Sequence, residues 1–400
     1  MKILVLNAGS SSLKYQLIDM DGEKLLAKGL VERIGIEGSH INQKVGDKVF
    51  DAVAPMANHT EGIEWMLKAL LDPEKGALKS MDEIGAVGHR VLHGGERFTA
   101  SVLINEEVKE AIRANIPLGP LHNPANLMGI EACEKVMPGT PNVAVFDTAF
   151  HQTMPPKSYM YGVPMDYYER LHVRRYGFHG TSHRYVSKRA CEFLGIPREG
   201  TRVITCHLGN GSSLAAVQDG KCLDTSMGIT PLEGVLMGTR CGSVDAAVVQ
   251  YIANNDHMTV DEVLTMMNKK SGLLGISGIS SDMRDIDAAA DAGNERAIIA
   301  RDMLVWGIRK YIGAYAAEMG GVDVIVFTAG IGENNVALRE RIMKNFEYLG
   351  AKLDPAKNNT RSESVISADD SKVKIVVIPT DEEIVIARDT LCIVTGREIE

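Results

Sequence analysis

Three arginines lie beside glycine turns, a pattern typical of side chains that bind phosphate or carboxylate groups. Arg90 precedes a Gly-Gly pair, Arg240 lies in a Gly-Thr-Arg-Cys-Gly stretch, and Arg284 ends the glycine-rich segment 272–284. A guanidinium offers a planar fork of donors that matches the oxygens of either anion. One such arginine is most often a solvated surface charge. Three of them in a chain of net charge -9 indicate clamps for phosphate and carboxylate.

Four histidines form two pairs at the i, i+4 spacing that lets helical histidines bind zinc. The pairs are His89 with His93 and His179 with His183. Glycines directly follow the first pair and interrupt the second, and neither pair has the glutamate of a zinc-peptidase helix. A metallohydrolase is therefore the weaker interpretation. His179 lies among glycine, threonine and serine, a setting more typical of a functional site than of a core.

The pattern of apolar strand, glycine-serine turn, strand and Asp-Gly turn occurs twice, over residues 3–22 and 203–220. In the second copy, the turn 209–213 combines residues that tolerate positive φ with hydroxyl and backbone N–H groups, which suits an anion-binding nest. A single copy is most simply an ordinary glycine-rich hairpin. The repeat, in which Ser12-Leu13 of the first copy matches Ser213-Leu214 of the second, predicts a duplicated domain with paired phosphate loops facing a shared cleft.

A third glycine turn, Gly330-Ile331-Gly332, follows an apolar strand and precedes a helix, where dinucleotide-binding proteins carry their fingerprint. Asn335 replaces the third glycine of that fingerprint, and the sequence contains no P-loop signature. Neither nicotinamide binding nor a P-loop NTPase is indicated. The turn still allows a nucleotide to approach backbone N–H groups at a helix N-terminus.

The elements that must position these residues alternate between strands and helices, which predicts an α/β fold. Polar residues recur at the ends of apolar strands, where open α/β sheets bind their ligands. Strands are expected at 2–7, 12–18, 24–31, 84–90, 143–146, 322–328 and 373–378, and in three short runs within 203–225. Helices are expected at 61–71, 106–114, 123–136, 182–194 (capped by Thr181), 244–254, 260–268, 295–319, from about 336, and at 381–391. Segment 272–284 is expected to be a functional loop, and the polar segment after residue 31 carries no predicted element.

The chain of 400 residues is longer than a single hydrophobic core usually accommodates, so two domains are expected. Residues 1–150, joined by the C-terminal helix 383–400, would form one domain. Residues 151–382 would form a nucleotide-binding and dimerisation domain, and the proline-rich stretch 154–164 would be the crossing between the two.

The composition, 45% hydrophobic and 24% charged residues, is typical of a soluble globular protein. The negative net charge argues against a nucleic-acid partner. No apolar run has membrane-spanning length and the first residues begin a strand, so we expect a cytoplasmic protein without a membrane partner. The scattered cysteines predict small buried side chains rather than disulfides or a zinc site: Cys133, Cys191, Cys206, Cys222, Cys241 and Cys392.

Six motifs spread over the whole chain resemble those of acetate kinases. They are Asn7 to Lys14, Gly88 to Gly95, Phe146 to His151, Tyr176 to His183, His207 to Ser213 and Pro379 to Glu383. The resemblance implies the duplicated actin-like, ribonuclease H-like fold of actin, sugar kinases and heat-shock ATPases, with a nucleotide cleft between two domains. It also implies a cytoplasmic homodimer that reversibly phosphorylates acetate to acetyl phosphate with Mg-ATP, releasing ADP.

The same resemblance assigns roles to individual residues. Asp147 would be the acid/base residue, His179 and Arg240 would stabilise the transition state, and His122 would lie near the transferring phosphoryl group. Arg90 would bind the carboxylate. Asn7 and either Glu382 or Glu383 would hold Mg²⁺, for which Mn²⁺ could substitute. The acyl group would contact Leu92, Leu121, Phe178 and Pro231. The nucleotide would contact Ser12, Lys14, His207, Leu208, Gly209, Asn210, Gly211, Asp282, Met283, Arg284, Gly330, Ile331, Gly332, Glu333 and Asn334.

Two departures from the family pattern leave alternatives open. Leu92 stands where valine is common, so a propionate or butyrate kinase remains an alternative, and Asp381 stands where asparagine is usual, next to the predicted metal ligands. A nucleotide-gated binding module is the alternative from another class, but such a switch has no use for the carboxylate clamp at Arg90. Because an acetate carboxylate is already ionised near neutral pH, no general base is required, and we expect Asp147 to orient Arg90 or a metal-bound water.

Overall fold

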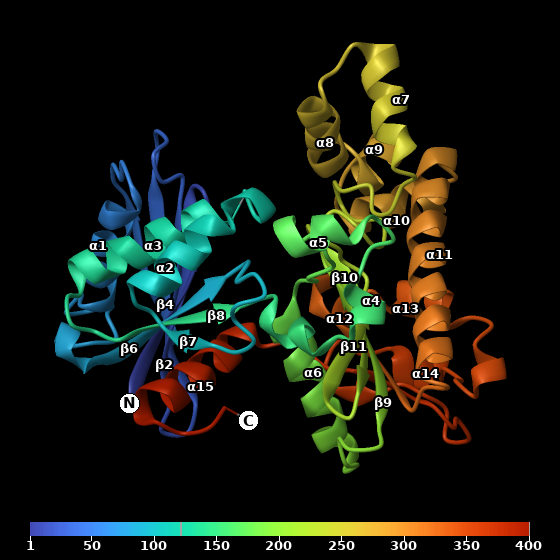
Figure 1. The fold of residues 1–400 in the computed structure, drawn as a ribbon. Coiled ribbons are helices and arrows are strands. Elements are labelled where there is room, and N and C mark those ends of the chain that lie inside the picture. The colour runs from blue at the N-terminus through green and yellow to red at the C-terminus, as the bar shows by residue number, and fades with distance from the viewer. Residues whose placement is uncertain (121, 400) are drawn as a thin grey trace. The chain divides into compact units, whose positions relative to one another are not determined.

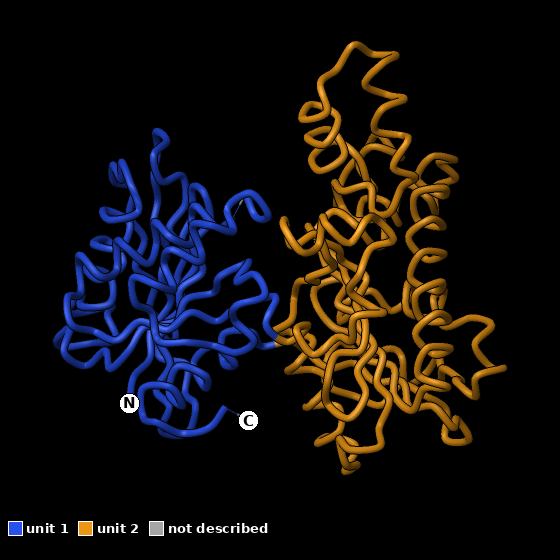
Figure 2. Tube along the Cα trace, viewed as in Figure 1, with its two compact units in different colours: residues 1–149, 381–400 blue, residues 150–380 orange. Residues whose placement is uncertain are grey.

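The computed structural model describes residues 1–120 and 122–399, and Figure 1 shows their helices and strands. The chain divides into two compact units, coloured separately in Figure 2. Unit 1 comprises residues 1–149 and 381–400, and unit 2 comprises residues 150–380. The proline-rich stretch 154–164 therefore lies inside unit 2, a few residues beyond the division at 149 and 150.

Unit 1 is built on an eight-stranded sheet in the order β5-β4-β3-β2-β1-β6-β8-β7. Its first five strands form an antiparallel meander, and β6 and β8 continue the sheet parallel to β1. The strands are β1 (Lys2–Ala8), β2 (Ser12–Asp19), β3 (Lys24–Glu32), β4 (His40–Val45), β5 (Lys48–Val53), β6 (Ile84–Val91), β7 (Val102–Leu103) and β8 (Asn142–Phe146).

Side chains alternate across the first hairpin, which gives the sheet one apolar face and one face with polar groups. Leu6 and Leu13 are buried in a core with helices α1 and α3. Asn7 and Lys14 pair across the hairpin at the alternate positions, and α15 contacts β1, β6 and β8. The helices of unit 1 are α1 (His59–Leu70), η1 (Met81–Glu83), α2 (Glu106–Ala114), η2 (Ile116–Leu118), α3 (Asn123–Val136) and α15 (Glu382–Thr395).

Helix α15 reaches the sheet because Gly88 of β6 has no side chain. A Cβ atom at Gly88 would lie 2.4 Å from Thr390 Oγ1 and 2.6 Å from Ile386 Cγ2. Real Cβ atoms do not approach other atoms so closely, so any larger residue would push the helix away from the sheet. The glycine thereby sets the position of Glu382 at the start of α15.

Unit 2 is built on a six-stranded sheet in the order β11-β10-β9-β12-β14-β13, with helices on both faces. Val203 and Val217 pack with α6, whereas the alternate residues Ile204 and Leu214 pack with α11. The strands are β9 (Arg202–Leu208), β10 (Ser212–Gln218), β11 (Lys221–Thr225), β12 (Val324–Thr328), β13 (Ser364–Val365) and β14 (Lys374–Val377).

The remaining helices all lie in unit 2, apart from the first residue of η3. The longest, α11 (Glu295–Glu318), contacts α9, α10 and α13. The others are η3 (Ala149–Thr153), α4 (Pro156–Tyr159), α5 (Met165–Leu171), α6 (Gly180–Leu194), α7 (Ala247–Asp256), α8 (Val260–Lys269), α9 (Gly272–Ser277), α10 (Met283–Asp291), α12 (Ala329–Asn334), α13 (Val336–Met343), η4 (Glu347–Leu349) and α14 (Pro355–Asn358).

The two sheets repeat one topology. In unit 1, the meander β1-β2-β3 is extended by the parallel strands β6 and β8, and in unit 2 the meander β9-β10-β11 is extended by the parallel strands β12 and β14. Each unit therefore contains one copy of the repeat predicted from residues 3–22 and 203–220. The α/β class and the duplication are confirmed.

Three local predictions were wrong. Residues 40–45 and 48–53 form the hairpin β4-β5, although their polar sequence predicted no element. Helix α6 begins at Gly180 with His179 as its N-cap, so Thr181 lies inside the first turn. Segment 272–284 is not one loop, because α9 occupies 272–277 and α10 starts at Met283.

The first histidine pair does not lie on a helix, and the cysteines form no disulfide. His89 belongs to strand β6, so its i, i+4 spacing to His93 does not place the two on one helix face. All six cysteines are free thiols, of which Cys133, Cys191, Cys206 and Cys222 are buried and two are half-buried. No helix within residues 1–120 and 122–399 combines the length and the apolar character needed to cross a membrane.

The buried His89 makes the stability of the fold depend on pH. Its Nε2 lies 2.7 Å from Asn142 Oδ1, and burial lowers the pKa of the ring to about 4. An unfolded histidine titrates near pH ~6.5, so the unfolded chain binds more protons between about pH 6.5 and 4. The free energy of unfolding must then decrease as the pH falls through this window.

His89 should lower the free energy of unfolding by on the order of 1–2 kcal/mol between about pH 7 and pH 5. We expect the variant His89→Gln, whose side-chain amide can also donate to Asn142, to lose that much less stability over the same interval. Urea unfolding at both pH values measures it. An equal loss in the two proteins would contradict the assignment.

Candidate functional site

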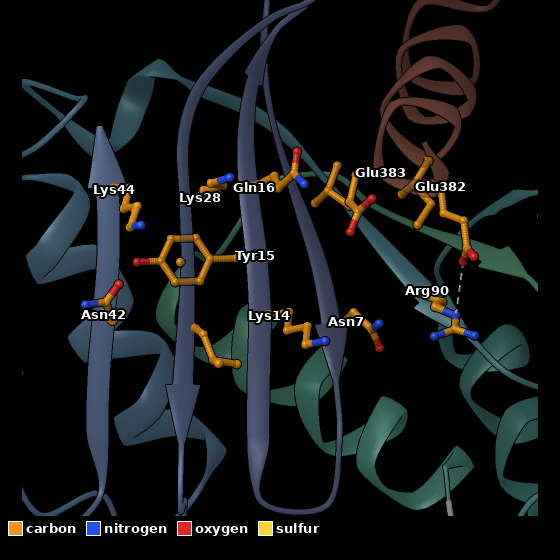
Figure 3. Close-up of a pocket in the computed structure, with 14 residues that line it drawn as sticks. Asn7, Lys14, Tyr15, Gln16, Lys28, Asn42, Lys44, Arg90, Glu382 and Glu383 are labelled. Atoms are coloured by element: carbon orange, nitrogen blue, oxygen red, sulfur yellow. Dashed lines mark ion pairs between the residues drawn. The ribbon is translucent and has the colours of Figure 1, made fainter. Parts of the chain in front are cut away.

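A cavity of about 280 Å³ in unit 1 brings together five of the predicted site residues. Asn7 comes from β1, Lys14 from β2, Arg90 from the end of β6, and Glu382 and Glu383 from the first turn of α15 (Figure 3). The cavity, which Lys28 and Lys44 also line, thus combines oxygen ligands with four cations, a composition that can hold an anion and a hard metal ion.

Arg90 and Asp147 form a bidentate ion pair at the ends of β6 and β8. Arg90 Nη2 donates to Asp147 Oδ2 at 2.7 Å and Nε donates to Oδ1 at 3.1 Å. The Asp147 side chain is completely buried, and its carboxylate raises the pKa of the Arg90 guanidinium despite the cost of burial. Since both carboxylate oxygens are occupied by Arg90, Asp147 is arranged to orient that guanidinium.

Glu382 lies at the edge of this pair. Its Oε2 is 3.9 Å from Arg90 Nε, the contact drawn dashed in Figure 3. Burial raises the pKa of the Glu382 carboxyl to about 7; Arg90 opposes the shift, while Asp147 and Glu383 add to it. A carboxylate held among other carboxylates is stabilised when a cation binds to it.

Asp381 caps α15. Its Oδ1 accepts a hydrogen bond from Ile384 N at 3.0 Å, so the side chain satisfies one of the free N–H groups at the start of the helix. Asparagine and aspartate perform this role equally well, which accounts for the Asp381 departure from the family pattern.

No group of three or more His, Cys, Asp or Glu side chains suited to a metal ion occurs in the described part of the chain.

The predicted acyl-contact residue Leu92 follows β6 and is buried. Asn126 of α3 fixes it, accepting from Leu92 N at 3.0 Å and donating to Ala8 O at 3.0 Å. His122 is the N-cap residue of α3. Leu121, the other acyl contact predicted in this segment, lies outside the described residues.

In the first hairpin turn, Gly9 N donates to Ser12 O at 2.8 Å. Ser12 is half-buried at the start of β2, two residues before Lys14. The turn therefore lies next to the strand that carries the cavity lysine.

In unit 2, the hydroxyl of Ser213 joins two of the histidines. His179 Nδ1 lies 2.8 Å from Ser213 Oγ, and His183 Nε2 lies 2.7 Å from the same atom. His183 Nδ1 contacts Thr205 Oγ1 at 2.7 Å. Burial, reinforced by neighbouring histidines, lowers the pKa of His183 well below its ordinary value. A neutral, buried His183 thus fixes Ser213, and Ser213 fixes the ring of His179.

The backbone and ring of His179 are also constrained. Its φ of 57° and ψ of 23° are left-handed, a conformation that costs free energy for a residue with a Cβ atom. Its ring stacks on His207 with centroids 4.2 Å apart. His207 Nδ1 lies 2.8 Å from Ser182 Oγ, which also contacts Thr380 Oγ1 at 2.8 Å.

Arg240 and His179 both face the glycine turn between β9 and β10. A Cβ atom at Gly211 would lie 3.5 Å from Arg240 Nη1 and 3.5 Å from His179 Nε2. Arg240 Nη1 donates to Pro231 O at 3.0 Å, and no ion pair links Arg240 to a carboxylate among the described residues. A cation without a carboxylate partner beside a glycine turn suits an anionic ligand.

The turn is closely packed on its far side, where a Cβ atom at Gly238 would lie 1.9 Å from Asn210 Oδ1. Gly238 N donates to Asn210 O at 3.0 Å. Phe178, another predicted acyl contact, is buried directly before His179. The structure therefore brings His179 and Arg240 to the loop 207–211, with Pro231 bonded to Arg240 and Phe178 next to His179 in the chain.

The glycine turn 330–334 is a short helix, α12, rather than an open loop. Ala329 at its start is left-handed with φ of 65°. Glu333 Oε1 accepts from Ala329 N at 2.7 Å and from Thr380 N at 3.1 Å, so this carboxylate caps the helix. In this arrangement Glu333 stabilises the loop backbone, while Gly330 and Asn334 are exposed.

The predicted residues 282–284 lie at the N-terminus of α10. The Asp282 carboxylate accepts from Arg284 N at 2.9 Å and from the Arg284 guanidinium, whose Nη2 is 2.6 Å from Oδ2, and these bonds lower the pKa of Asp282 to about 2. Arg284 is 89% exposed. Met283 is buried in the core below them.

The family follows from the sequence comparison. The sequence model of the acetokinase family matches residues 2–388. This chain belongs to the acetokinase family. The acetate kinase of Finegoldia magna is 58% identical over 391 residues, covering 98% of this chain and 99% of that protein. The acetate kinase of Desulfitobacterium hafniense is 56% identical over 396 residues, with coverage of 98% and 99%.

Solved acetokinase-family structures have the same fold. The acetate kinase of Porphyromonas gingivalis matches with a TM-score of 0.94 at 50% identity, covering 98% of this chain and 99% of that chain. A propionate kinase from Francisella tularensis matches with a TM-score of 0.91 at 42% identity and the same coverage. The resemblance stated from the motifs is therefore confirmed, and the protein is a kinase, that is, a phosphotransferase.

Several residues that hold the candidate site in place were missed in the sequence. Asn126, Ser213 as a histidine partner, and Arg339 all act through contacts far apart in the chain. Only Ser213 carried a signal, since it belongs to the duplicated glycine-serine turn. For the other two, no spacing or local motif distinguishes them from ordinary helix residues.

Arg339 stabilises helix α12 by donating hydrogen bonds to its backbone carbonyls. It is fully buried and donates to Gly332 O, Glu333 O, Asn358 Oδ1, Asn358 O and Thr360 O at 2.7–2.8 Å. We expect Arg339→Met to destabilise the protein by about 3–5 kcal/mol, because buried carbonyls lose charged donors. Urea unfolding measures the change. Arg341→Met, on the same helix and 43% exposed, is the control, and its free energy of unfolding should stay within about 0.5 kcal/mol of the unsubstituted protein's.

Proposed function

We propose that this protein transfers the γ-phosphoryl group of ATP reversibly to acetate, forming acetyl phosphate and ADP. The observation that carries the proposal is the Arg90–Asp147 pair beside a cavity that also holds Asn7, Lys14 and Glu382. A half-buried guanidinium held by a buried carboxylate is a fixed receptor for a second carboxylate. The acetate kinases at 58% and 56% identity support acetate as that substrate.

The reaction needs alignment and charge neutralisation more than proton transfer. An acetate oxygen forms the new bond to the γ-phosphorus, the bond from that phosphorus to the bridging oxygen breaks, and ADP leaves with the electron pair. Acetate enters as the carboxylate, so Asp147 has no proton to remove. In this proposal Asp147 holds Arg90 in place, and Arg90 holds the acetate.

The donor set beside Arg90 fits Mg²⁺. Asn7 offers an amide oxygen, and Glu382 and Glu383 offer carboxylates, which are hard ligands of the kind that Mg²⁺ and Mn²⁺ prefer. When bound, the ion supplies positive charge to the phosphate oxygens. Glu382 is the better candidate ligand, because its pKa is raised among carboxylates and a cation would relieve that repulsion.

The unit 2 residues are proposed to bind and activate the nucleotide. Asn210 is exposed on the turn 209–211, whose Gly209 N–H is already bonded to Gly211 O at 3.2 Å, and Gly330 and Asn334 are exposed at α12. Arg240 and His179 face the same turn and would neutralise charge on the transferring phosphoryl group. His122 of unit 1 is proposed to contact that group as well, as the family resemblance implies.

The protein is proposed to be a cytoplasmic homodimer, with no nucleic-acid partner. Helix α11 exposes Ile299, Met303 and Trp306, at 52%, 47% and 66%, beside an apolar hollow of about 740 Å³ in unit 2. An exposed apolar patch of this kind is typical of an interaction surface. A second copy of the chain is the occupant expected from the family resemblance.

One assay tests the function. The protein is incubated with Mg-ATP and, separately, with carboxylates of two, three and four carbons, and acyl phosphate is trapped with hydroxylamine. We expect acetyl hydroxamate with the highest kcat/KM. A higher kcat/KM with the three-carbon or four-carbon acid would favour the alternative propionate or butyrate kinase, and hydroxamate from none of them would refute the kinase proposal.

Substituting Leu92 tests whether this side chain limits the length of the acyl chain that the protein accepts. Leucine adds one methylene to the valine common at this position, and one methylene changes discrimination by about 1–3 kcal/mol. We expect Leu92→Ala to raise kcat/KM for propionate relative to acetate about tenfold. Val102→Ala, in β7 outside the proposed site, is the control. An unchanged ratio would show that Leu92 does not line the acyl pocket.

Substituting Arg240 tests whether its side chain binds the substrates or stabilises the transition state. We expect Arg240→Ala to lower kcat by about 10²–10³-fold, because a preorganised donor to developing charge is lost. KM for acetate and ATP should change little, which is the signature of an interaction made chiefly in the transition state. Steady-state kinetics in both substrates measure it, and a rise in KM for ATP at constant kcat would make Arg240 a binding residue only.

A further inference from the structure

The loop that carries Pro231 has no regular structure of its own. Residues 226–246, all of them described, form neither helix nor strand between β11 and α7. Pro231 O is nevertheless a defined acceptor, 3.0 Å from Arg240 Nη1. The position of the Arg240 guanidinium therefore depends on how this irregular loop is held.

Arg175 holds the loop at two points. Its Nη1 donates to three consecutive carbonyls, Thr225 O at 2.8 Å and Ser226 O and Met227 O at 3.2 Å. Its Nη2 donates to Glu233 Oε1 at 2.8 Å. The guanidinium is mostly buried, with 16% exposure. One side chain thus ties the start of the loop to a residue six positions further on.

Tyr161 holds the middle of the loop. Its hydroxyl accepts from Ile229 N at 3.0 Å and donates to Glu233 Oε2 at 2.5 Å. There is no space for a side chain here, since a Cβ atom at Gly228 would lie 1.9 Å from Glu233 Oε2 and 2.3 Å from the Tyr161 oxygen. Pro231 lies between Ile229 and Glu233, both of which are held by Tyr161.

The same contacts tie the loop to the segment that carries His179. Arg175 is four residues before His179 in the chain. Tyr176 N and Gly177 N both donate to Gly228 O, at 3.1 Å and 3.2 Å. The segment leading to His179 and the loop leading to Arg240 are therefore fixed against each other.

We propose that Tyr161, Arg175 and Glu233 form a loop clamp, a set of positioning residues that places the Pro231 carbonyl and through it the Arg240 guanidinium. The inference rests on the proposed role of Arg240. Arg240 has no carboxylate partner in the described chain to hold it. Its Nη1 contacts the Met237 sulfur at 3.7 Å and the Pro231 carbonyl at 3.0 Å, and the carbonyl, as the stronger acceptor, fixes its direction. A displacement of about 1 Å at such a group costs up to about 10²-fold in rate.

The test is a double-mutant cycle between Tyr161→Phe and Arg240→Ala. Tyr161→Phe removes one hydroxyl and keeps the ring. We expect kcat to fall about tenfold in the otherwise unchanged protein, with KM for ATP and acetate within about twofold. In the Arg240→Ala background, Tyr161→Phe should change kcat by less than about twofold, because the guanidinium that it positions is absent.

Tyr167→Phe is the matched control, since Tyr167 lies on α5 and is 45% exposed. It should leave kcat unchanged. Circular dichroism and thermal unfolding check that each variant is folded. If Tyr161→Phe does not fold, Glu233→Gln replaces it in the cycle, because it keeps the shape and removes the charge that pairs with Arg175.

The outcomes distinguish failure of the loop-clamp proposal from failure of the proposed kinase function. Equal losses of kcat in both backgrounds would mean that Tyr161 acts independently of Arg240, and unchanged kcat in the first background would mean that the loop does not place Arg240. Either result overturns the clamp while leaving the kinase intact. Absence of acetyl hydroxamate from the unsubstituted protein would refute the proposed function and the clamp with it.

Discussion

The parallel register of β6 and β8 is the constraint on which the unit 1 site depends. Val91 pairs with Phe146, and Asp147 N donates to Val91 O at 3.0 Å, so the chain directly after β8 lies beside Arg90. Burying a carboxylate and a guanidinium is costly unless each satisfies the other. The two hydrogen bonds between Arg90 and Asp147 meet that condition and fix the direction of the guanidinium.

Both units place polar groups at the carboxyl ends of equivalent strands, as open α/β sheets do. In unit 1 these are Asn7 at the end of β1, Arg90 near the end of β6 and Asp147 after β8. In unit 2, His207 lies near the end of β9, and Ser182 links it to Thr380, which follows β14. The repeated topology therefore supplies two sets of strand ends, one with charged groups and one with imidazoles, hydroxyls and glycine turns.

Two arginines of unit 2 use their guanidinium groups chiefly to bind groups within the fold. Arg339 has five carbonyl or amide acceptors, and burial lowers its pKa to about 10. For Arg175, burial also opposes the charge, but Glu233 and Asp224 outweigh it and raise the pKa. Both act on irregular backbone, α12 in one case and the Pro231 loop in the other. A guanidinium can bind several carbonyls at once, which suits it to holding segments that lack ladder hydrogen bonds.

The sequence by itself determined the α/β class, the duplication, the family and many element boundaries. Helices α2 and α3 begin and end at the predicted residues, because capping side chains and a proline in the first turn are local signals. The hairpin β4-β5 was missed because its strands alternate polar and apolar residues weakly, and the pairing of β4 with β3 and of β5 with β4 decides their state. Tertiary structure alone decided the partners: Arg90 with Asp147, His179 with Ser213, and Glu333 with the Thr380 backbone. These residues are 34 to 57 positions apart, and a contact at that separation depends on sheet register, which no local pattern of residues encodes.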